Sequence, residues 1–395
     1  MQKILIITPD YPPDIYGGIG THVLHLTEKL KKEYELIVFT IRLKKVGFEN
    51  PIIRRNAGIT VIDFPTKYEK ITELYKVGPD THPFIMGQVN YLVFNYLDEL
   101  IKENSEICLI HNHFFYFNIM TEIFRKNYKI PVVTTHHFFT IWGEKKNYLD
   151  MVMRHSITSS DANIFVSKWL CDYAKQATDL DNIPNQQVIY NGMDFKDSES
   201  YLKKPIRDKE SVEITYCGRL SKLKGVDILL KAVRIFKLNN NLSQKVHVTI
   251  VGDGAERDNL KQLAKDLLLD DCVTFTGYLS QPLAKQKMRE SDVMVIPSLN
   301  EPFGLVALEA MANGTAVLAS NSGGLKEIIV DGENGIFFLP NDEMDLALKL
   351  QYIITHPTLK LKLETQGKLT ASKFDWDEIA HETSEVYKSL IGKYK

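Results

Sequence analysis

The chain has 395 residues, 44% of them hydrophobic and 25% charged, which is enough for two or three globular domains with apolar cores. Its 48 basic and 50 acidic side chains leave a formal net charge of -2 at pH 7, so no global field draws it to nucleic acid. Four widely spaced cysteines argue against a disulfide framework, and the apolar run at residues 4–7 is too short for a signal peptide or a membrane span. We therefore expect a cytoplasmic protein.

Short β-branched runs alternate with amphipathic stretches of helical length through nearly the whole sequence, a pattern typical of parallel α/β structure. In the first half, strands are predicted at residues 3–8, 35–40, 59–63, 107–111, 131–135, 162–166 and 186–190. In the second half, strands are predicted at residues 212–217, 246–251, 273–276, 293–296, 315–319 and 335–338.

A polar stretch at residues 193–211 contains Pro205 and has no periodic apolar face, which makes it the best linker candidate. It separates two similar halves, predicted to be Rossmann-like domains at residues 1–200 and 201–374. Open parallel sheets bind ligands beyond the carboxyl ends of their strands, so two such domains facing each other would enclose a central cleft. The tail at residues 375–395 is expected to form a helix that packs back on the first domain.

The most informative segment is EPFGLVALEAMANG at residues 301–314, a loop that opens into a helix after the strand at 293–296. Free backbone amides at a helix N-terminus favour a phosphate or a sugar hydroxyl, and Gly304 lets a ligand approach the backbone closely. The helix is apolar except at Glu309, whose carboxylate needs partners if it is buried. Glu301 and Glu309 are therefore predicted to face one ligand. A buried helix with a solvated Glu301 is the structural alternative.

A basic segment, GRLSKLKG at residues 218–225, follows the strand at 212–217. A strand end is where such a sheet presents its ligand site, and Arg219 with Lys224 can hold a diphosphate, the arginine as a fork and the lysine as a point charge. Taken alone, the segment favours a solvated turn, but its combination with the glutamate segment favours a diphosphate site.

These two segments, followed by SGGLKEIIVDGENG at residues 322–335, resemble the donor-binding half of retaining glycosyltransferases of the GT-B fold, in particular family 4. The resemblance covers almost the whole chain, and its motifs come in the same order. It implies two Rossmann-like domains, with the acceptor domain first. It also implies transfer of a hexosyl or N-acetylhexosaminyl group from a nucleoside-diphosphate sugar to a hydroxyl.

The resemblance also implies roles for single residues. Glu301 would meet hydroxyls of the donor sugar and Glu309 would hold the ribose, while Arg219 and Lys224 would grip the diphosphate and stabilise it as it leaves. The backbone of Phe303, Gly304 and Leu305 would line the sugar and phosphate. Further donor contacts are expected near Gly252, Tyr278 and Leu279, and a UDP-sugar is favoured over a GDP- or ADP-sugar.

The first half supports the same interpretation. After the strand at 3–8 comes a proline-stiffened loop that ends in Gly17 and Gly18, and glycines at a strand-to-helix turn bring backbone amides close to a phosphate. The loop fails as a dinucleotide fingerprint because Gly18-x-Gly20 lacks the third glycine. It is similar to the family's proline- and glycine-rich loop, which makes Gly17 and Gly18 candidates for donor contact.

Histidines follow two of the predicted strands in the first half. Aligned on the family's P-V-V-x-T-x-H pattern, His137 is the residue expected near the reacting carbon, and His136 occupies the variable position. His113 and His136 are weaker candidates at the acceptor side. A histidine at a strand end is also a common structural hydrogen bonder. The turn at 191–194, NGMD, resembles a junction motif of the family and is expected to be structural.

No carboxylate pair in the first half has the pattern of a glycosidase nucleophile and acid. The resemblance implies retention of configuration by front-face attack, in which the leaving diphosphate helps to deprotonate the acceptor. The D-x-D pattern at residues 179–181 lies in a polar stretch and not directly after a buried strand, so neither a metal ion nor a cofactor is predicted.

The acceptor is predicted to be a carbohydrate, a lipid-linked sugar or a small molecule. Loops at 64–86 and 138–147 are expected to shape its site. A basic loop at residues 42–55 offers peripheral contact with anionic lipid at the inner face of a membrane, or it is simply solvated.

Two other functions fit parts of the sequence. One is a sugar-nucleotide-binding protein that no longer transfers and acts as a regulatory or scaffold partner. The other is a nicotinamide-dependent dehydrogenase, which the α/β pattern permits but the missing glycine fingerprint disfavours.

Overall fold

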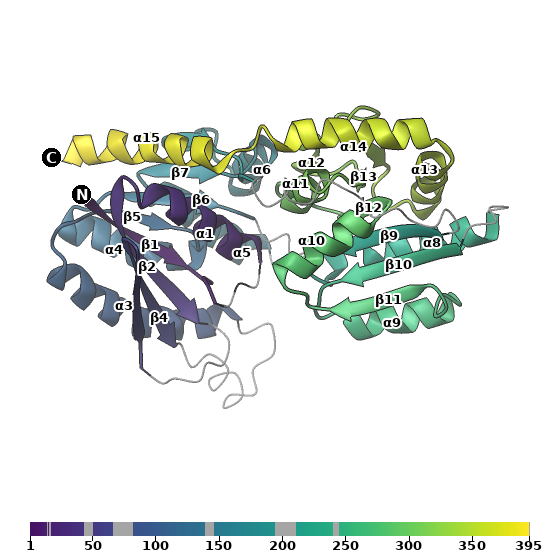
Figure 1. Ribbon diagram of the computed structural model, residues 1–395. Coiled ribbons are helices and arrows are strands. Elements are labelled where there is room, and N and C mark those ends of the chain that lie inside the picture. The colour runs from purple at the N-terminus through teal and green to yellow at the C-terminus, as the bar shows by residue number, and fades with distance from the viewer. Residues whose placement is uncertain are drawn as a thin grey trace. The chain divides into compact units, whose positions relative to one another are not determined.

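The computed structural model describes residues 1–13, 15, 17–42, 50–65, 82–138, 146–193, 211–239 and 245–394. The chain forms two compact units (Figure 1), residues Met1–Gly192 with Trp376–Lys395 and residues Met193–Asp375. Most of the predicted linker at 193–211 lies outside the described residues. Within the described part of the chain, no helix is both long enough and apolar enough to cross a membrane.

The described part of the first domain is built on an eight-stranded sheet in the order β3-β4-β2-β1-β5-β6-β7-β8. The strands are β1 (Gln2–Thr8), β2 (Tyr34–Arg42), β3 (Ile52–Asn56), β4 (Ile59–Pro65), β5 (Ile107–Asn112), β6 (Val132–His136), β7 (Ala162–Phe165) and β8 (Gln186–Val188). All of their pairings are parallel except β3 with β4.

Alternate side chains of each strand enter different cores because successive residues of a strand point to opposite faces. Ile4 and Ile6 of β1 pack with one core, and Leu5 and Ile7 pack with the other. The first core is closed by α1 (Gly18–Leu30) and α15 (Trp376–Tyr394), and the second by α3 (His82–Glu103) and α4 (Asn118–Tyr128). The described helices of this domain are α1 (Gly18–Leu30), α3 (His82–Glu103), η2 (Phe115–Phe117), α4 (Asn118–Tyr128), α5 (Lys146–Thr158), α6 (Lys168–Thr178) and α15 (Trp376–Tyr394).

The C-terminal helix α15 is an integral part of the first domain. Its Tyr387 is fully buried, and Ser384 shares a 2.8 Å hydrogen bond with the Tyr34 hydroxyl of β2. Trp376 stands so close to Gly192 that a Cβ there would lie 2.5 Å from the indole. The chain thus enters the second domain after Gly192 and returns at Trp376.

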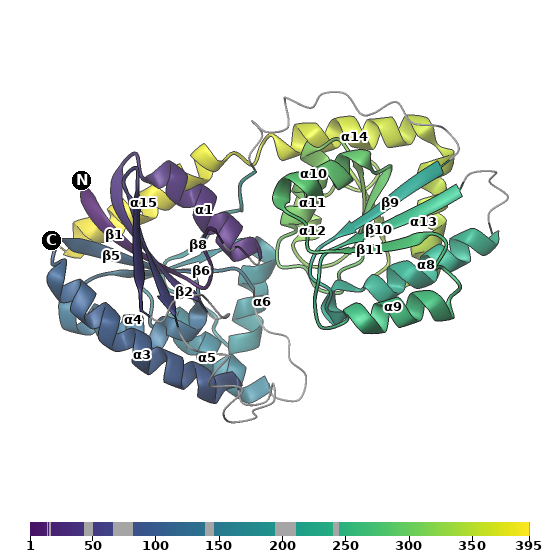
Figure 2. The same cartoon turned by 60° about the horizontal axis from the view of Figure 1, so that its bottom comes forward.

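The described second domain contains a six-stranded parallel sheet in the order β11-β10-β9-β12-β13-β14. Its strands are β9 (Ser211–Cys217), β10 (Lys245–Val251), β11 (Val273–Gly277), β12 (Val293–Ile296), β13 (Ala316–Ser320) and β14 (Ile336–Phe338). Helices α8 (Val226–Asn239), α9 (Arg257–Asp266) and α13 (Glu343–Thr355) cover one face, as Figure 2 shows. The remaining helical segments are η3 (Lys222–Lys224), α10 (Gln281–Glu290), α11 (Leu305–Ala312), α12 (Leu325–Ile328) and α14 (Pro357–Ala371).

The predicted α/β architecture is confirmed. Every strand expected from the sequence is present, with ends shifted by at most two residues. The strand order reverses between β1 and β5 in one sheet and between β9 and β12 in the other. Such switch points are where open α/β sheets bind ligands.

Strand β3 corrects the predicted basic loop at residues 42–55. Ile52–Asn56 pairs antiparallel with β4 through the two-residue turn Ala57-Gly58, in which both φ angles are positive (40° and 88°), as in a type I′ hairpin. The Arg54 guanidinium donates to Asp63 and to the carbonyl of Pro12, both at 2.6 Å. Arg54 therefore ties the strand edge to the loop after β1. Lys44 and Lys45 lie outside the described residues.

Candidate active site

Two predicted donor-site residues from different strand ends lie in contact. Lys224 comes from η3 after β9, Glu301 comes from the loop after β12, and the Lys224 ammonium donates to the Glu301 carboxylate at 2.7 Å. The Ser298 hydroxyl donates to the same oxygen at 3.1 Å, and Glu301 is only 8% exposed. The Glu301 side chain is 10% exposed and the Lys224 side chain 28%, so loss of the lysine would leave a nearly buried carboxylate without its counter-charge.

A serine- and glycine-rich loop fixes the segment that carries Glu301. The hydroxyls of Ser320 and Ser322 donate to the Ser298 carbonyl at 2.5 and 2.7 Å, and the Gly324 amide donates to the Glu301 carbonyl at 2.8 Å. Gly323 adopts a left-handed conformation (φ +58°), and a Cβ there would stand 2.1 Å from the Glu301 carbonyl oxygen. The motif SGG after β13 thus holds the backbone that carries Glu301 in place, a role that could not be predicted from its position in the sequence.

Helix α11 begins at a sharp backbone turn. Gly304 has φ +107°, and no side chain caps the helix N-terminus. Its first amides are therefore available to an anion or a hydroxyl. The Phe303 ring is buried, 6.0 Å from the Phe374 ring, so only its backbone can serve a ligand. The partly exposed residues of α11 are Leu305, Val306 and Glu309.

Glu309 is the titratable group of this helix. Part of its side chain reaches the surface, but desolvation of the carboxyl raises its pKa to about 7, against the opposing charge of Lys285. The same carboxylate contributes to the raised pKa of Cys217, about 12, for which burial is the larger cause. Glu309 therefore lies near the carboxyl end of β9, the strand that leads to Lys224.

The other predicted donor contacts are more dispersed. Arg219 is exposed, and its carbonyl accepts a 2.9 Å hydrogen bond from Tyr216. Gly252 (φ +131°) approaches Gly218, whose carbonyl oxygen would lie 1.9 Å from an added Cβ, so packing between strand ends accounts for this glycine. Tyr278 is 69% exposed and Leu279 is partly buried.

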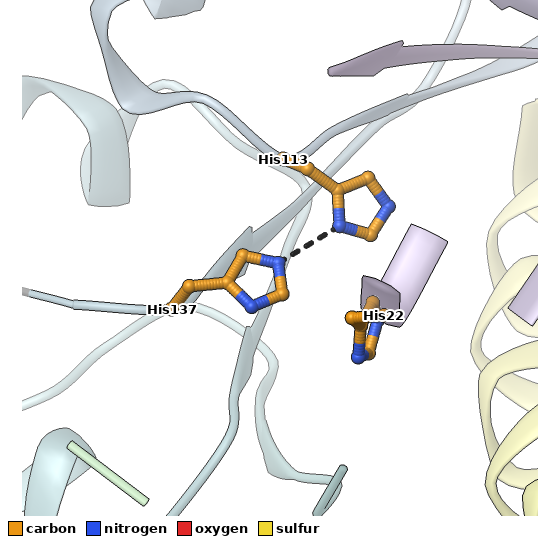
Figure 3. A group of neighbouring side chains, drawn as sticks. All are labelled: His22, His113 and His137. Atoms are coloured by element: carbon orange, nitrogen blue, oxygen red, sulfur yellow. Dashed lines mark hydrogen bonds between the residues drawn. The ribbon is translucent and has the colours of Figure 1, made fainter. Parts of the chain in front are cut away.

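In the first domain, three histidines gather at the carboxyl ends of β5 and β6 and at the start of α1 (Figure 3). They are His113, His137 and His22. The Nδ1 atom of His113 lies 3.0 Å from the Nε2 atom of His137. The Nδ1 atom of His22 lies 2.7 Å from Oδ1 of Asn191. Burial lowers the pKa of His22 to about 4 and holds the pKa values of His113 and His137 well below the usual range, so all three rings are neutral.

Two neighbouring histidines are structural by their contacts. Both ring nitrogens of His111 are paired, one with the Tyr387 hydroxyl of α15 and the other with Thr135 at 2.7 Å. His136 is buried, pairs with Asn163 at 2.9 Å and stacks on Phe165. The structure therefore does not bring His136 into the histidine cluster, although it was predicted as an acceptor-side candidate.

Two predicted donor-site glycines, Gly17 and Gly18, lie at the start of α1. Gly17 precedes the helix without a side-chain cap, and a Cβ on Gly18 would meet nothing within 4 Å. Both residues are exposed.

The D-x-D pattern begins at Asp179, the residue that ends α6 in a left-handed conformation. Its backbone carbonyl accepts a 3.0 Å hydrogen bond from the Arg154 guanidinium. The predicted acceptor loops lie largely outside the described residues.

The sequence analysis assigned no role to three residues of these sites. His22 lies on the first turn of α1, four residues after Gly18, and Asn191 belongs to the turn expected to be structural. Ser298 is three residues before Glu301. Closeness in sequence to a predicted site residue is the one signal that points to His22 and Ser298.

Comparisons with known proteins agree with this arrangement. The sequence model described as Glycosyltransferase Family 4 matches residues 16–197, and the one described as Glycosyl transferases group 1 matches residues 197–370. An uncharacterized glycosyltransferase of Methanocaldococcus jannaschii is 29% identical over 98% of both chains. A glycogen synthase of Mycobacterium tuberculosis is 26% identical over 98% of this chain and 94% of its own.

Solved structures share the fold. Sucrose-phosphate synthase from Thermosynechococcus elongatus superimposes with a TM-score of 0.83 over 100% of both chains at 22% identity. Trehalose-6-phosphate synthase OtsA superimposes with a TM-score of 0.81 over 98% of this chain and 99% of its own at 14% identity. With family matches on both halves and this common fold, the chain belongs to the family 4, group 1 glycosyltransferases of GT-B architecture.

Proposed function

We propose that the protein is a retaining, metal-independent glycosyltransferase that moves a hexosyl or N-acetylhexosaminyl group from a UDP-sugar to a hydroxyl acceptor. The Lys224–Glu301 pair at the β9/β12 switch point carries the proposal. The Lys224 ammonium can bind a diphosphate, and the Glu301 carboxylate can accept hydrogen bonds from sugar hydroxyls. The choice of UDP is supported by neighbours of the same fold, among them Anabaena HepE in complex with UDP-glucose (TM-score 0.69, 19% identity, covering 98% of this chain and 99% of that one).

In the proposed reaction, the second domain binds the donor. Lys224 and Arg219 contact the diphosphate, Glu301 accepts from sugar hydroxyls, and Glu309 accepts from the ribose. The amides at the start of α11 add a positive helix end near the phosphates. The first domain contributes His137 near the anomeric carbon and Gly17 and Gly18 at the donor phosphates.

The chemistry needs no covalent enzyme intermediate. The bond between the anomeric carbon and the diphosphate oxygen breaks, the acceptor oxygen bonds the same face of that carbon, and the acceptor proton passes to the leaving diphosphate. Stabilising the departing charge and orienting the acceptor are then the protein's tasks. The carboxylates of the donor site serve binding and not nucleophilic attack.

A nucleotide thermal-shift experiment tests the donor site. UDP in a chelator should stabilise the protein by about 2.7 kcal/mol at a hundred times its dissociation constant, and GDP, ADP and NAD should do so much less. Sugar transfer from the matching donor should also persist in the chelator. Stabilisation by UDP without transfer to any acceptor would favour the regulatory binding protein, and stabilisation by NAD alone would contradict the donor site.

The raised pKa of Glu309 predicts pH-dependent donor affinity. Ribose hydroxyls donate more strongly to a carboxylate than to a neutral carboxyl group, so binding favours the ionised form. With a pKa of about 7 in the free protein, affinity for UDP should rise roughly tenfold between about pH 6 and pH 8 and then level off. Isothermal titration should show this rise in the wild type. Glu309→Gln should remove it, and a wild-type profile that matches the variant would contradict the role of Glu309.

A further inference from the structure

The rings of His22, His113 and His137 lie close enough together to bind one shared ion. The ring centres lie 5.3 Å (His22–His113), 4.8 Å (His22–His137) and 5.3 Å (His113–His137) apart. One nitrogen from each ring lies within 4.8 Å of the other two. Three imidazoles bound to one tetrahedral zinc ion, with Zn–N distances of about 2.0–2.1 Å, would place their ring centres roughly 5 Å apart. The three separations therefore suit a shared metal ion.

His22 already has the orientation of a metal ligand. An amide carbonyl oxygen only accepts, so His22 donates from Nδ1 to Asn191 and keeps the lone pair of Nε2 free. Histidine ligands of metal ions commonly donate their second nitrogen to such a partner, which holds the ring in place. Asn191 accepts this hydrogen bond next to Gly192, the residue after which the chain leaves the first domain.

His113 is incompletely satisfied without a ligand. His113 is 2% exposed, and its Nε2 atom is buried with no hydrogen-bond partner in the described part of the chain. His111, one ring away at 4.0 Å, has both nitrogens paired. His113 therefore has one unpaired ring nitrogen, Nε2, while its Nδ1 atom faces His137.

We propose that His22, His113 and His137 form a site for a zinc-class transition-metal ion, with a fourth position open to water or substrate, and that occupancy of this site inhibits sugar transfer. The donor set is imidazole only, which suits zinc, copper or nickel and not magnesium or calcium. The inhibition rests on the proposed function, because a bound ion takes His137 from its place near the anomeric carbon. Transfer is thus metal-independent, and zinc opposes it.

Zinc binding tests the site without any substrate. Chelator-treated full-length protein is titrated with zinc chloride against a chromophoric zinc indicator, with excess magnesium present. The wild type should bind zinc at one saturable site that magnesium does not block. His22→Ala and His113→Ala should lose this site. Asn191→Ala should weaken it by about 10–100-fold, as expected when the partner of a metal-bound histidine is removed.

Two matched variants control for other histidines. His25 lies on the same helix as His22 but stacks on Trp376, and the Nε2 atom of His155 lies 3.2 Å from the Glu122 carboxylate. His25→Ala and His155→Ala should bind zinc as the wild type does. Absence of saturable binding in the folded wild type, or binding that survives both His22→Ala and His113→Ala, would overturn the proposed site.

Inhibition is measured separately, as each variant's transfer rate with zinc relative to its own rate in chelator. Saturating zinc should abolish wild-type transfer, and this sensitivity should disappear in His22→Ala. If zinc binds but does not inhibit transfer, the inhibitory role is overturned and the zinc site itself is still supported. If the protein transfers no sugar in chelator without added zinc, this result counts against the proposed function and not against zinc binding.

Discussion

Replacing Glu301 with alanine is expected to lower kcat of sugar transfer by about 10²–10³-fold, the loss that follows removal of one preorganised electrostatic contact in an active site. The variant removes the acceptor of both Lys224 at 2.7 Å and Ser298 at 3.1 Å. Lys224 would then stand without its carboxylate where the proposed diphosphate departs. Steady-state kinetics with the donor varied would measure kcat and KM separately.

The effect of Glu301→Ala has two internal comparisons. Glu309→Ala should mainly raise the donor KM, because ribose contacts are the same in the bound substrate and in the transition state. Glu333→Ala removes an exposed carboxylate of the same domain and should change neither constant. Equally small effects of Glu301→Ala and Glu309→Ala on kcat/KM would contradict the proposed donor site.

Replacing Gly323 with alanine is expected to impair both folding stability and turnover. The new Cβ would lie 2.1 Å from the Glu301 carbonyl oxygen, so the backbone that carries Glu301 must move. Such a shift disturbs the geometry of the Lys224–Glu301 pair, and small displacements in an active site cost about a hundredfold in rate. Circular dichroism during heating and the kinetics of transfer would measure the two effects.

Gly332 provides a matched control for Gly323. Both glycines have a left-handed backbone, with φ +74° at Gly332 and +58° at Gly323, but a Cβ on Gly332 would meet nothing within 4 Å. Gly332→Ala should therefore lose only the conformational preference, roughly 1–2 kcal/mol of stability, with turnover intact. Equal losses of turnover in the two variants would show that the contact with Glu301 is unimportant.

Local patterns were sufficient to predict most of the secondary structure. The buried parallel strands are β-branched apolar runs, so their positions follow from composition over a few residues. Strand β3 was missed because it is an edge strand whose isoleucines are exposed, Ile53 at 55% and Ile52 at 40%. An edge strand depends on pairing with its neighbour, here β4, and that pairing is absent from the local pattern.

For the candidate site too, the positions of single residues follow from local sequence, whereas the contacts between them depend on the tertiary structure. The sequence by itself determined that Glu301 and Lys224 lie in the segments that follow β12 and β9, because both strands are recognisable apolar runs, and that Glu309 lies on the helix that comes next. Only the tertiary structure decided that Lys224 meets Glu301, 77 positions apart, and that His22 meets Asn191, 169 positions apart. The order of strands in each sheet controls these contacts, and that order is chosen by packing of the whole domain and not by local propensity.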